Sequence, residues 1–314
     1  MKNIAIGVIA LAVLAAAGTV LPSWAVFLVT MALAKGLVSL GIVTMMRAGV
    51  VSFGQGLFYC LGAYVAALLA QATGSTDIFL LGFAAIVVAI VVGLVFGPLL
   101  STYRGIFFAM LSLSLSMILY GALSKMTVLG GTDGMNVAAA TFLGFHPEDR
   151  PLQLSLYFFT MAVTVLASIG LRIYFDSQRG LISLAIRDNE LRVEYLGSSV
   201  RHAMTVNYVI AAALGGIGGA ISAVAIGHVD PEFAYWTTSG EFVFVAILAG
   251  YLSIPAVFVA SIILELVRSF SNLYFPNSWQ LALGVFLLVV IFVLPDGIGS
   301  WLSRRGSAVR GAGR

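Results

Sequence analysis

The sequence predicts an all-α protein that spans a membrane: a polytopic bundle of roughly ten helices with one short helix on its cytoplasmic side. Three observations predict this fold class. Of 314 residues, 61% are hydrophobic and 9% are charged, whereas a soluble globular chain has about 25% charged residues. Apolar segments long enough to span a bilayer recur along the chain. Basic and acidic residues alternate between those segments. A helix bundle surrounded by hydrocarbon fits all three observations.

Apolar segments of membrane-spanning length cover most of the chain. A helix needs about 20 apolar residues to cross the hydrocarbon core. Eight segments each allow one crossing: residues 4–21, 24–46, 50–70, 78–100, 105–123, 154–175, 205–227 and 280–302. A ninth region, residues 233–270, is long enough for two crossings and is interrupted at Ser253, Ile254 and Pro255. Length alone therefore predicts roughly ten crossings.

Charged residues between these segments predict the orientation. Basic residues gather in cytoplasmic loops, so the loops with Arg47, Arg104 and the cluster from Arg172 to Arg201 are predicted to be cytoplasmic, as are both chain termini. Acidic residues fall in the alternate loops: Asp77, Asp133, Glu148, Asp149, Asp230 and Glu232. Residues 233–270 must then be crossed twice, with a cytoplasmic turn at the Ser-Ile-Pro break. Arg268 is the exception to the rule, because it falls toward the outer side.

The chain is predicted to hold one membrane domain with a short segment at each end. Residues 1–23 are predicted to be the first transmembrane helix, although residues 1–25 also fit a signal peptide. Residues 24–302 form the main domain, and residues 303–314 a basic cytoplasmic tail. Cys60 is the only cysteine, so no disulfide within the chain is possible. The net charge of +3 is too small to indicate nucleic acid binding.

The loop of residues 176–204 is the most charged segment of the chain. Apolar residues recur in it at near-helical spacing, which predicts a short amphipathic helix beneath the membrane; they are Leu181, Leu184, Leu191 and Tyr195. A dense polar group interrupts them: Arg187, Asp188, Asn189 and Glu190. Gly197 suits the end of the helix. From these residues two interpretations are open: the helix docks a separate soluble motor, or it lies on the lipid headgroups.

Polar residues inside the apolar segments are the candidates for a permeation path. Lys35 lies near the centre of a predicted crossing, where an unpaired ammonium costs about 2.5–3.5 kcal/mol on insertion scales. We therefore expect Lys35 to face the bundle interior and to pair with Glu241 or Glu265. Ser52 and Gln55 lie one turn apart among glycines that favour a broken helix, and an unwound turn offers free backbone groups to a polar solute. Close packing of small residues is the alternative.

Two glycine-rich segments have further interpretations. Gly215 and Gly219 form a Gly-x-x-x-Gly pair, which predicts close helix packing. Residues 130–134 read Gly-Gly-Thr-Asp-Gly and predict a tight outer turn, in which Thr132 and Asp133 either line an outer gate or are simply solvated. No metal-ligand spacing appears among the histidines, which are His146, His202 and His228. The chain has no phosphate-binding loop, so it is not itself an ATPase.

Several of these segments resemble one family. The stretch from Arg179 to Ala223 is similar to the branched-chain amino acid ABC transporter permease family, in particular to the second of its two permease subunits. AGVVSFGQG at 48–56, GGTDG at 130–134 and LPDGI at 294–298 also resemble family motifs, and they keep the family's order from about residue 24 to residue 302. Two features depart from the family. Gln55 stands where the family most often has His, and residues 249–256 lack several glycines of a family turn.

The resemblance implies the permease subunit of an ABC importer in a bacterial inner membrane. A second permease, two subunits that bind the ATP and a periplasmic solute-binding protein would complete the importer, and this chain would need no cofactor and catalyse no reaction. The coupling helix would lie in the loop of residues 176–204, with coupling assigned to Gly180, Ala185, Ile186, Arg187, Asp188, Asn189, Glu190 and Gly197. The translocation path would include Lys35, Ser52, Gln55, Thr132, Asp133 and Glu241. Branched-chain amino acids are the expected solutes, with urea, short amides and aromatic acids as further options.

Two other functional classes fit less well. An ion-coupled secondary transporter usually has acidic residues at helix midpoints, and here only Lys35, Glu241 and Glu265 approach such positions. An intramembrane enzyme needs a convergent set of histidine, carboxylate or nucleophilic side chains, and no such set appears in the predicted crossings.

Overall fold

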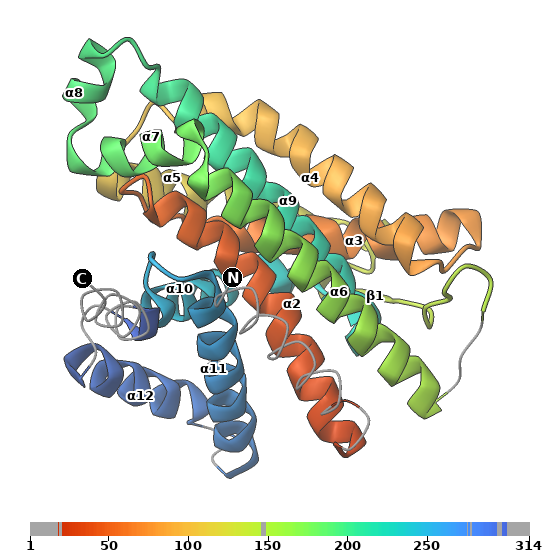
Figure 1. Ribbon diagram of the computed structural model, residues 1–314. Helices are drawn as coiled ribbons and strands as arrows, with labels where there is room; N and C mark the ends of the chain where they lie inside the picture. The colour runs from red at the N-terminus through yellow and green to blue at the C-terminus, as the bar shows by residue number, and fades with distance from the viewer. Residues whose placement is uncertain are drawn as a thin grey trace.

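The predicted all-α fold is confirmed by a computed structural model, which describes residues 18, 21–145, 149–274, 276, 278–293 and 297–299 (Figure 1). Its helices are α2 (Ser23–Met46), α3 (Gln55–Thr73), α4 (Ile78–Leu100), α5 (Gly105–Lys125), α6 (Asp149–Asp176), α7 (Gln178–Asp188), α8 (Glu190–Tyr195), α9 (Val200–Ile226), α10 (Trp236–Ala249), α11 (Ile254–Tyr274) and α12 (Trp279–Val293). Three 3₁₀ turns, Thr127–Leu129, Gly131–Asp133 and Pro231–Ala234, lie between them. Two short strands, β1 (Met135–Asn136) and β2 (His228–Val229), pair antiparallel.

Seven of the described helices are long and apolar enough to cross a membrane: α2, α3, α4, α5, α6, α9 and α11. Two more, α10 and α12, are apolar but have only 14 and 15 residues. The predicted division of residues 233–270 into two helices is confirmed, since α10 ends at Ala249 and α11 begins at Ile254. Apart from residues 18 and 21, the predicted crossing at 4–21 lies outside the described residues, as do Glu148, residues 294–296 and the tail at 303–314.

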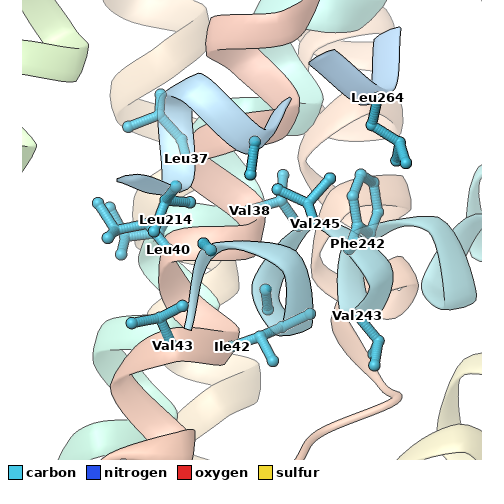
Figure 2. Close-up of a cluster of buried hydrophobic side chains, with 14 of the residues drawn as sticks. Leu37, Val38, Leu40, Ile42, Val43, Leu214, Phe242, Val243, Val245 and Leu264 are labelled. Carbon is cyan, nitrogen blue, oxygen red and sulfur yellow. The ribbon is translucent and has the colours of Figure 1, made fainter. Parts of the chain in front are cut away.

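Helix α9 lies at the centre of the bundle and packs against α2, α3 and α4 (Figure 1). Glycines on α9 allow this close approach, because a Cβ at Gly219 would overlap the carbonyl oxygen of Tyr59 in α3. A Cβ at Gly215 would lie 2.7 Å from the Cβ of Phe58. The other face of α2 packs against α10 and α11, and the apolar side chains from these helices and from α9 form the cluster drawn in Figure 2.

A largely buried non-helical segment precedes α3. The predicted crossing at 50–70 begins only at Gln55, because residues 50–54 form no helix. Serine hydroxyls accept hydrogen bonds from backbone amides around this junction: the Phe53 amide donates to Ser112 at 3.2 Å, and the Gly56 amide, in the first turn of α3, donates to Ser239 at 3.1 Å. Ser239 belongs to the first turn of α10. The amino-terminal ends of α3 and α10 therefore meet within the bundle.

The two ends of the bundle differ in charge, as the alternation predicts. At one end, called the basic end here, contacts join the α2 terminus, the α4–α5 turn, α7, α8 and the α10–α11 turn; its basic side chains include Arg47, Arg104, Arg179, Arg187, Arg192 and Arg201. At the opposite end, β1–β2 pairing and a hydrogen bond from the Leu143 amide to Asp77 join the alternate loops. That acidic end carries Asp77, Asp133, Asp230 and Glu232, with Lys125 and Arg150 among them.

Candidate functional site

The charged loop of residues 176–204 folds into two short helices, rather than the single helix that we predicted. Helix α7 begins after Ser177, whose hydroxyl accepts a hydrogen bond from the Gly180 amide at 3.4 Å. Asn189 separates α7 from α8, and its side-chain oxygen accepts a hydrogen bond from the Arg192 amide at 2.9 Å. Asn189 interrupts the helix because its backbone is extended, with φ −161° and ψ 103°, and its short side chain stabilises that conformation by capping α8.

Side-chain contacts fix this α7–α8 segment to the basic end of the bundle. Arg104, which precedes α5, forms an ion pair with Glu190 of α8, with 2.7 Å between Nη2 and Oε1. The guanidinium carbon of Arg187 lies 3.5 Å from the ring centroid of Tyr251, in the turn between α10 and α11. Ile186 is buried in the core. The segment is therefore joined to two different turns of the membrane bundle.

A buried polar chain also connects the α7–α8 segment to α6 and α9. The Tyr174 hydroxyl donates to the Asn207 side-chain oxygen at 2.6 Å, and the Asn207 amide nitrogen donates to Ser183 at 2.9 Å. Gly180 lies so close to α6 that a Cβ there would overlap the Tyr174 carbonyl oxygen. We did not predict Ser183 and Asn207 as functional residues, although Asn207 is a polar residue inside an apolar crossing.

The outer surface of the α7–α8 segment combines exposed apolar and charged side chains. Its large apolar residues are Leu181 (55% exposed), Leu191 (64%), Tyr195 (89%) and Leu196 (78%). The residues assigned to coupling are divided between two faces. Gly180 and Ile186 are buried and Glu190 is half-buried, whereas the exposed ones are Ala185, Arg187, Asp188, Asn189 and Gly197. The apolar residues whose spacing predicted an amphipathic helix therefore lie mainly on the exposed face of the segment.

Four charged side chains from α2, α10 and α11 form a cluster inside the bundle, which we call the ionic quartet: Lys35, Glu241, Glu265 and Arg268. The Lys35 ammonium lies 2.8 Å from Oε2 of Glu265 and 3.8 Å from Oε2 of Glu241. Arg268 donates from Nη1 to the same oxygen of Glu241 at 3.0 Å. The predicted pairing of Lys35 with Glu241 or Glu265 is confirmed, because Lys35 contacts both.

The ionic quartet also explains why Arg268 departs from the positive-inside rule. Arg268 does not lie in a loop, where a basic residue would influence orientation. It belongs to α11 and pairs with Glu241 of α10 within the bundle. Its charge is therefore compensated inside the protein, and the double crossing of residues 233–270 does not conflict with it.

Ser52 and Gln55 lie where the non-helical segment of residues 50–54 joins α3. Both are fully buried. The Ser52 hydroxyl accepts a hydrogen bond from the Gly54 amide at 3.3 Å. The side-chain amide of Gln55 has no hydrogen-bond partner in the described part of the chain, at either its oxygen or its nitrogen. Buried amides are usually paired, so an unpartnered one next to a helix break is an unusual feature.

Thr132 and Asp133 lie in the 3₁₀ turn Gly131–Asp133 at the acidic end, and both are exposed. The Thr132 hydroxyl donates a hydrogen bond to Asp133 Oδ1 at 3.4 Å. Gly130 and Gly134 flank the turn with φ values of 84° and 72°, which L side chains rarely adopt. Within the described residues, no group of three or more His, Cys, Asp or Glu side chains is placed to hold a metal ion.

Comparison with known proteins identifies one family. A family model described as "Branched-chain amino acid transport system / permease component" matches residues 24–294. Two curated proteins of Escherichia coli K12 are similar to the chain, the high-affinity branched-chain amino acid transport system permease proteins LivM and LivH. LivM is 26% identical over 274 residues, which cover 80% of this chain and 64% of LivM. LivH is 24% identical over 264 residues, which cover 80% of this chain and 85% of LivH. No solved structure matches.

Proposed function

Because the chain belongs to the family of permease components of branched-chain amino acid transport systems, we propose that it is the permease subunit of an ABC importer in a bacterial inner membrane. Residues 24–302 form the permease domain, and branched-chain amino acids are the solutes. Urea, short amides and aromatic acids are alternative solutes. ATP is bound by separate subunits, and this chain forms part of the translocation path.

The observation that carries this proposal is the α7–α8 segment. Its exposed face has large apolar side chains beside charges, the combination that a protein partner recognises. Arg104 anchors the segment to the α4–α5 turn, and Arg187 anchors it to the α10–α11 turn. A partner that moves this segment therefore moves the helices that follow those turns. We assign the segment as the coupling helix that docks on an ATP-binding subunit.

The partners follow from the two ends of the bundle. The basic end is cytoplasmic under the positive-inside rule and faces two ATP-binding subunits. The acidic end faces the periplasm, where Thr132 and Asp133 are exposed to a solute-binding protein. A second, homologous permease completes the membrane part. In support, two different permease proteins that are similar to this chain, LivM and LivH, carry the same transport-system name in one organism.

Transport is a two-state motion in this proposal. ATP binding and hydrolysis favour one state over the other only if the ATP-binding subunits contact the two states differently. The α7–α8 segment supplies that contact. Ser52 and Gln55 line the path at the helix break, and Lys35 and Glu241 line it at the ionic quartet. The unpartnered Gln55 amide supports its role, because a passing solute or water would satisfy it.

An ion-coupled secondary transporter is not favoured. Such a transporter needs carboxylates that exchange a proton or Na⁺ at helix midpoints. The intramembrane carboxylates that we considered for that role, Glu241 and Glu265, are each paired with a cationic side chain. Their charges are therefore already compensated within the chain.

Single cysteines at the two ends of the bundle test the proposed function. Replacing the buried Cys60 by Ala gives a cysteine-free background. In it, Tyr195→Cys places a thiol on α8 and Thr132→Cys places one at the acidic end. We expect a bifunctional crosslinker to join Tyr195→Cys, but not Thr132→Cys, to the ATP-binding subunit of the co-expressed importer.

A membrane-impermeant maleimide should show the reverse pattern on whole cells, labelling Thr132→Cys and not Tyr195→Cys. ATP-dependent uptake of leucine by proteoliposomes with the complete importer measures the activity. If Tyr195→Cys is labelled from outside, or never crosslinks to the ATP-binding subunit, the proposed coupling is wrong.

A further inference from the structure

We propose that the ionic quartet is a binding site for the zwitterionic backbone of an amino acid in transit, in which Arg268 contacts the carboxylate and Glu241 contacts the ammonium group. This inference deepens the proposed function and rests on it. It gives Arg268 a direct role in binding, and it makes Lys35 and Glu265 the positioning pair that holds Glu241 in place.

The four charges form a compact cluster of alternating sign, in which Glu265 and Arg268 lie three residues apart on α11. Arg268 lies 3.0 Å from Glu241, Glu241 lies 3.8 Å from Lys35, and Lys35 lies 2.8 Å from Glu265. The contact of 3.8 Å exceeds hydrogen-bond length and divides the cluster into two close pairs. One pair, Arg268 with Glu241, joins α11 to α10, and the other, Lys35 with Glu265, joins α2 to α11. The proposal requires the first pair to open toward the ligand while the second stays closed.

The two pairs differ in the exposed fraction of their cationic side chains. The Arg268 side chain is 36% exposed, whereas that of Lys35 is 9% exposed. The quartet is thus accessible mainly at its Arg268 end. These residues lie well inside α2, α10 and α11, where contact between a charged group and hydrocarbon is costly. The accessible side of the quartet therefore faces water, a polar ligand or the second permease rather than lipid.

The zero net charge of the quartet favours a ligand that is itself neutral overall. Two cations and two anions sum to zero, so a single added ion would leave an unpaired charge in the bundle. A zwitterion adds one charge of each sign. When it enters between Arg268 and Glu241, the guanidinium gains a carboxylate, for which its planar donors suit two parallel hydrogen bonds. Glu241 gains an ammonium and keeps Lys35 beside it, so every charge stays paired.

Replacing Arg268 by Lys separates binding from a purely structural role. Arg268→Lys keeps the positive charge that pairs with Glu241 but removes the planar fork. The complete importer is reconstituted in proteoliposomes with saturating binding protein loaded with radiolabelled leucine, and leucine uptake is divided by ATP hydrolysed. We expect Arg268→Lys to lower this ratio about tenfold, the effect of losing one charge-assisted hydrogen bond. Arg172→Lys, at an exposed ion pair on α6, is the matched control and should leave the ratio unchanged.

A second variant removes both charges of the accessible pair. Glu241→Gln/Arg268→Gln leaves no unpaired ion, and we expect it to lower the ratio at least as much as Arg268→Lys. Co-purification of the second permease and the ATP-binding subunit is measured for each variant. The quartet could instead only hold helices together or contact the second permease. In that case the double variant should lose co-purification, and the ratio of leucine uptake to ATP hydrolysed in Arg268→Lys should stay within twofold of wild type. That result overturns the site.

The outcome for the wild type separates this inference from the proposed function. Wild-type proteoliposomes without ATP-dependent leucine uptake contradict the proposed branched-chain amino acid transport and the site together. An active wild type with an unchanged ratio in both quartet variants contradicts the site alone. A lowered ratio with retained co-purification supports the site.

Discussion

At the scale of single residues, the sequence shows which side chains are out of place but not what each of them contacts. Lys35 is conspicuous because an ammonium group inside an apolar helix requires a partner. Its partner Glu265 is separated from it by 230 residues. Arg268 looked like an error in the topology and is instead one of the paired charges of the quartet. The partners could only be found once α2, α10 and α11 were placed together.

Gln55 carries a residue-scale prediction. Its buried amide has no partner among the described residues, and an unpaired buried polar group costs about 1–3 kcal/mol. Gln55→Leu removes this cost at similar volume. We therefore expect the variant to raise the free energy of unfolding by about 1–3 kcal/mol and to lower leucine uptake.

Thermal unfolding in detergent and proteoliposome uptake are the two measurements for Gln55→Leu. Gln71→Leu, at an exposed position near the other end of α3, is the control and should change neither. A lower melting temperature for Gln55→Leu would mean that the amide is already hydrogen-bonded, for example by water, and would argue against a vacant contact at the helix break.

At the scale of elements, the close packing of α3 against α9 depends on glycine. The Gly-x-x-x-Gly spacing predicts such an approach but does not identify the neighbouring helix. In the structure the Cβ position of Gly219 falls on the Tyr59 carbonyl oxygen, so the two backbones touch. The helix break before Gln55 is a second feature of this scale. Glycines at positions 49, 54 and 56 indicate a helix break in the sequence. The serines of α5 and α10 that accept hydrogen bonds from amides at the break could be identified only in the structure.

Gly219→Ala tests this packing. The added methyl overlaps backbone rather than a movable side chain, so we expect a loss of about 1–3 kcal/mol or more in unfolding free energy. Gly121→Ala is the matched control, since nothing lies within 4 Å of the added Cβ in α5. The control should be neutral or stabilising by up to about 1 kcal/mol, because alanine favours helix. Equal melting temperatures for the two variants would contradict the described packing.

At the scale of the whole molecule, charge separates the two ends of the bundle. The α10–α11 turn lies at the basic end, because Tyr251 contacts both Arg47 and Arg187. Arg47 is largely buried there, and this burial lowers the pKa of its guanidinium, while the nearby charge of Asp176 raises it. The turn lies at the same end of the bundle as the α7–α8 segment, although only 14 residues of α10 precede it.

The position of this turn gives a prediction about topology. In the cysteine-free background, Leu252→Cys should be protected from an impermeant maleimide in whole cells and labelled after permeabilisation. Val128→Cys, which is 91% exposed at the acidic end, should be labelled in both conditions. Labelling of Leu252→Cys in intact cells would mean that residues 233–270 do not cross twice, and the predicted orientation of the later helices would be wrong.

The sequence by itself determined the fold class, most of the crossings, the division of charge between the two ends and the break between α10 and α11. These depend on transfer free energies and backbone preferences that each residue brings with it, so they can be summed along the chain. The tertiary structure decided the membership of the ionic quartet, the division of the charged loop into α7 and α8, and the meeting of α3 and α10 inside the bundle. Each of these depends on contacts between residues far apart in sequence, whose energies exist only when the helices are packed together.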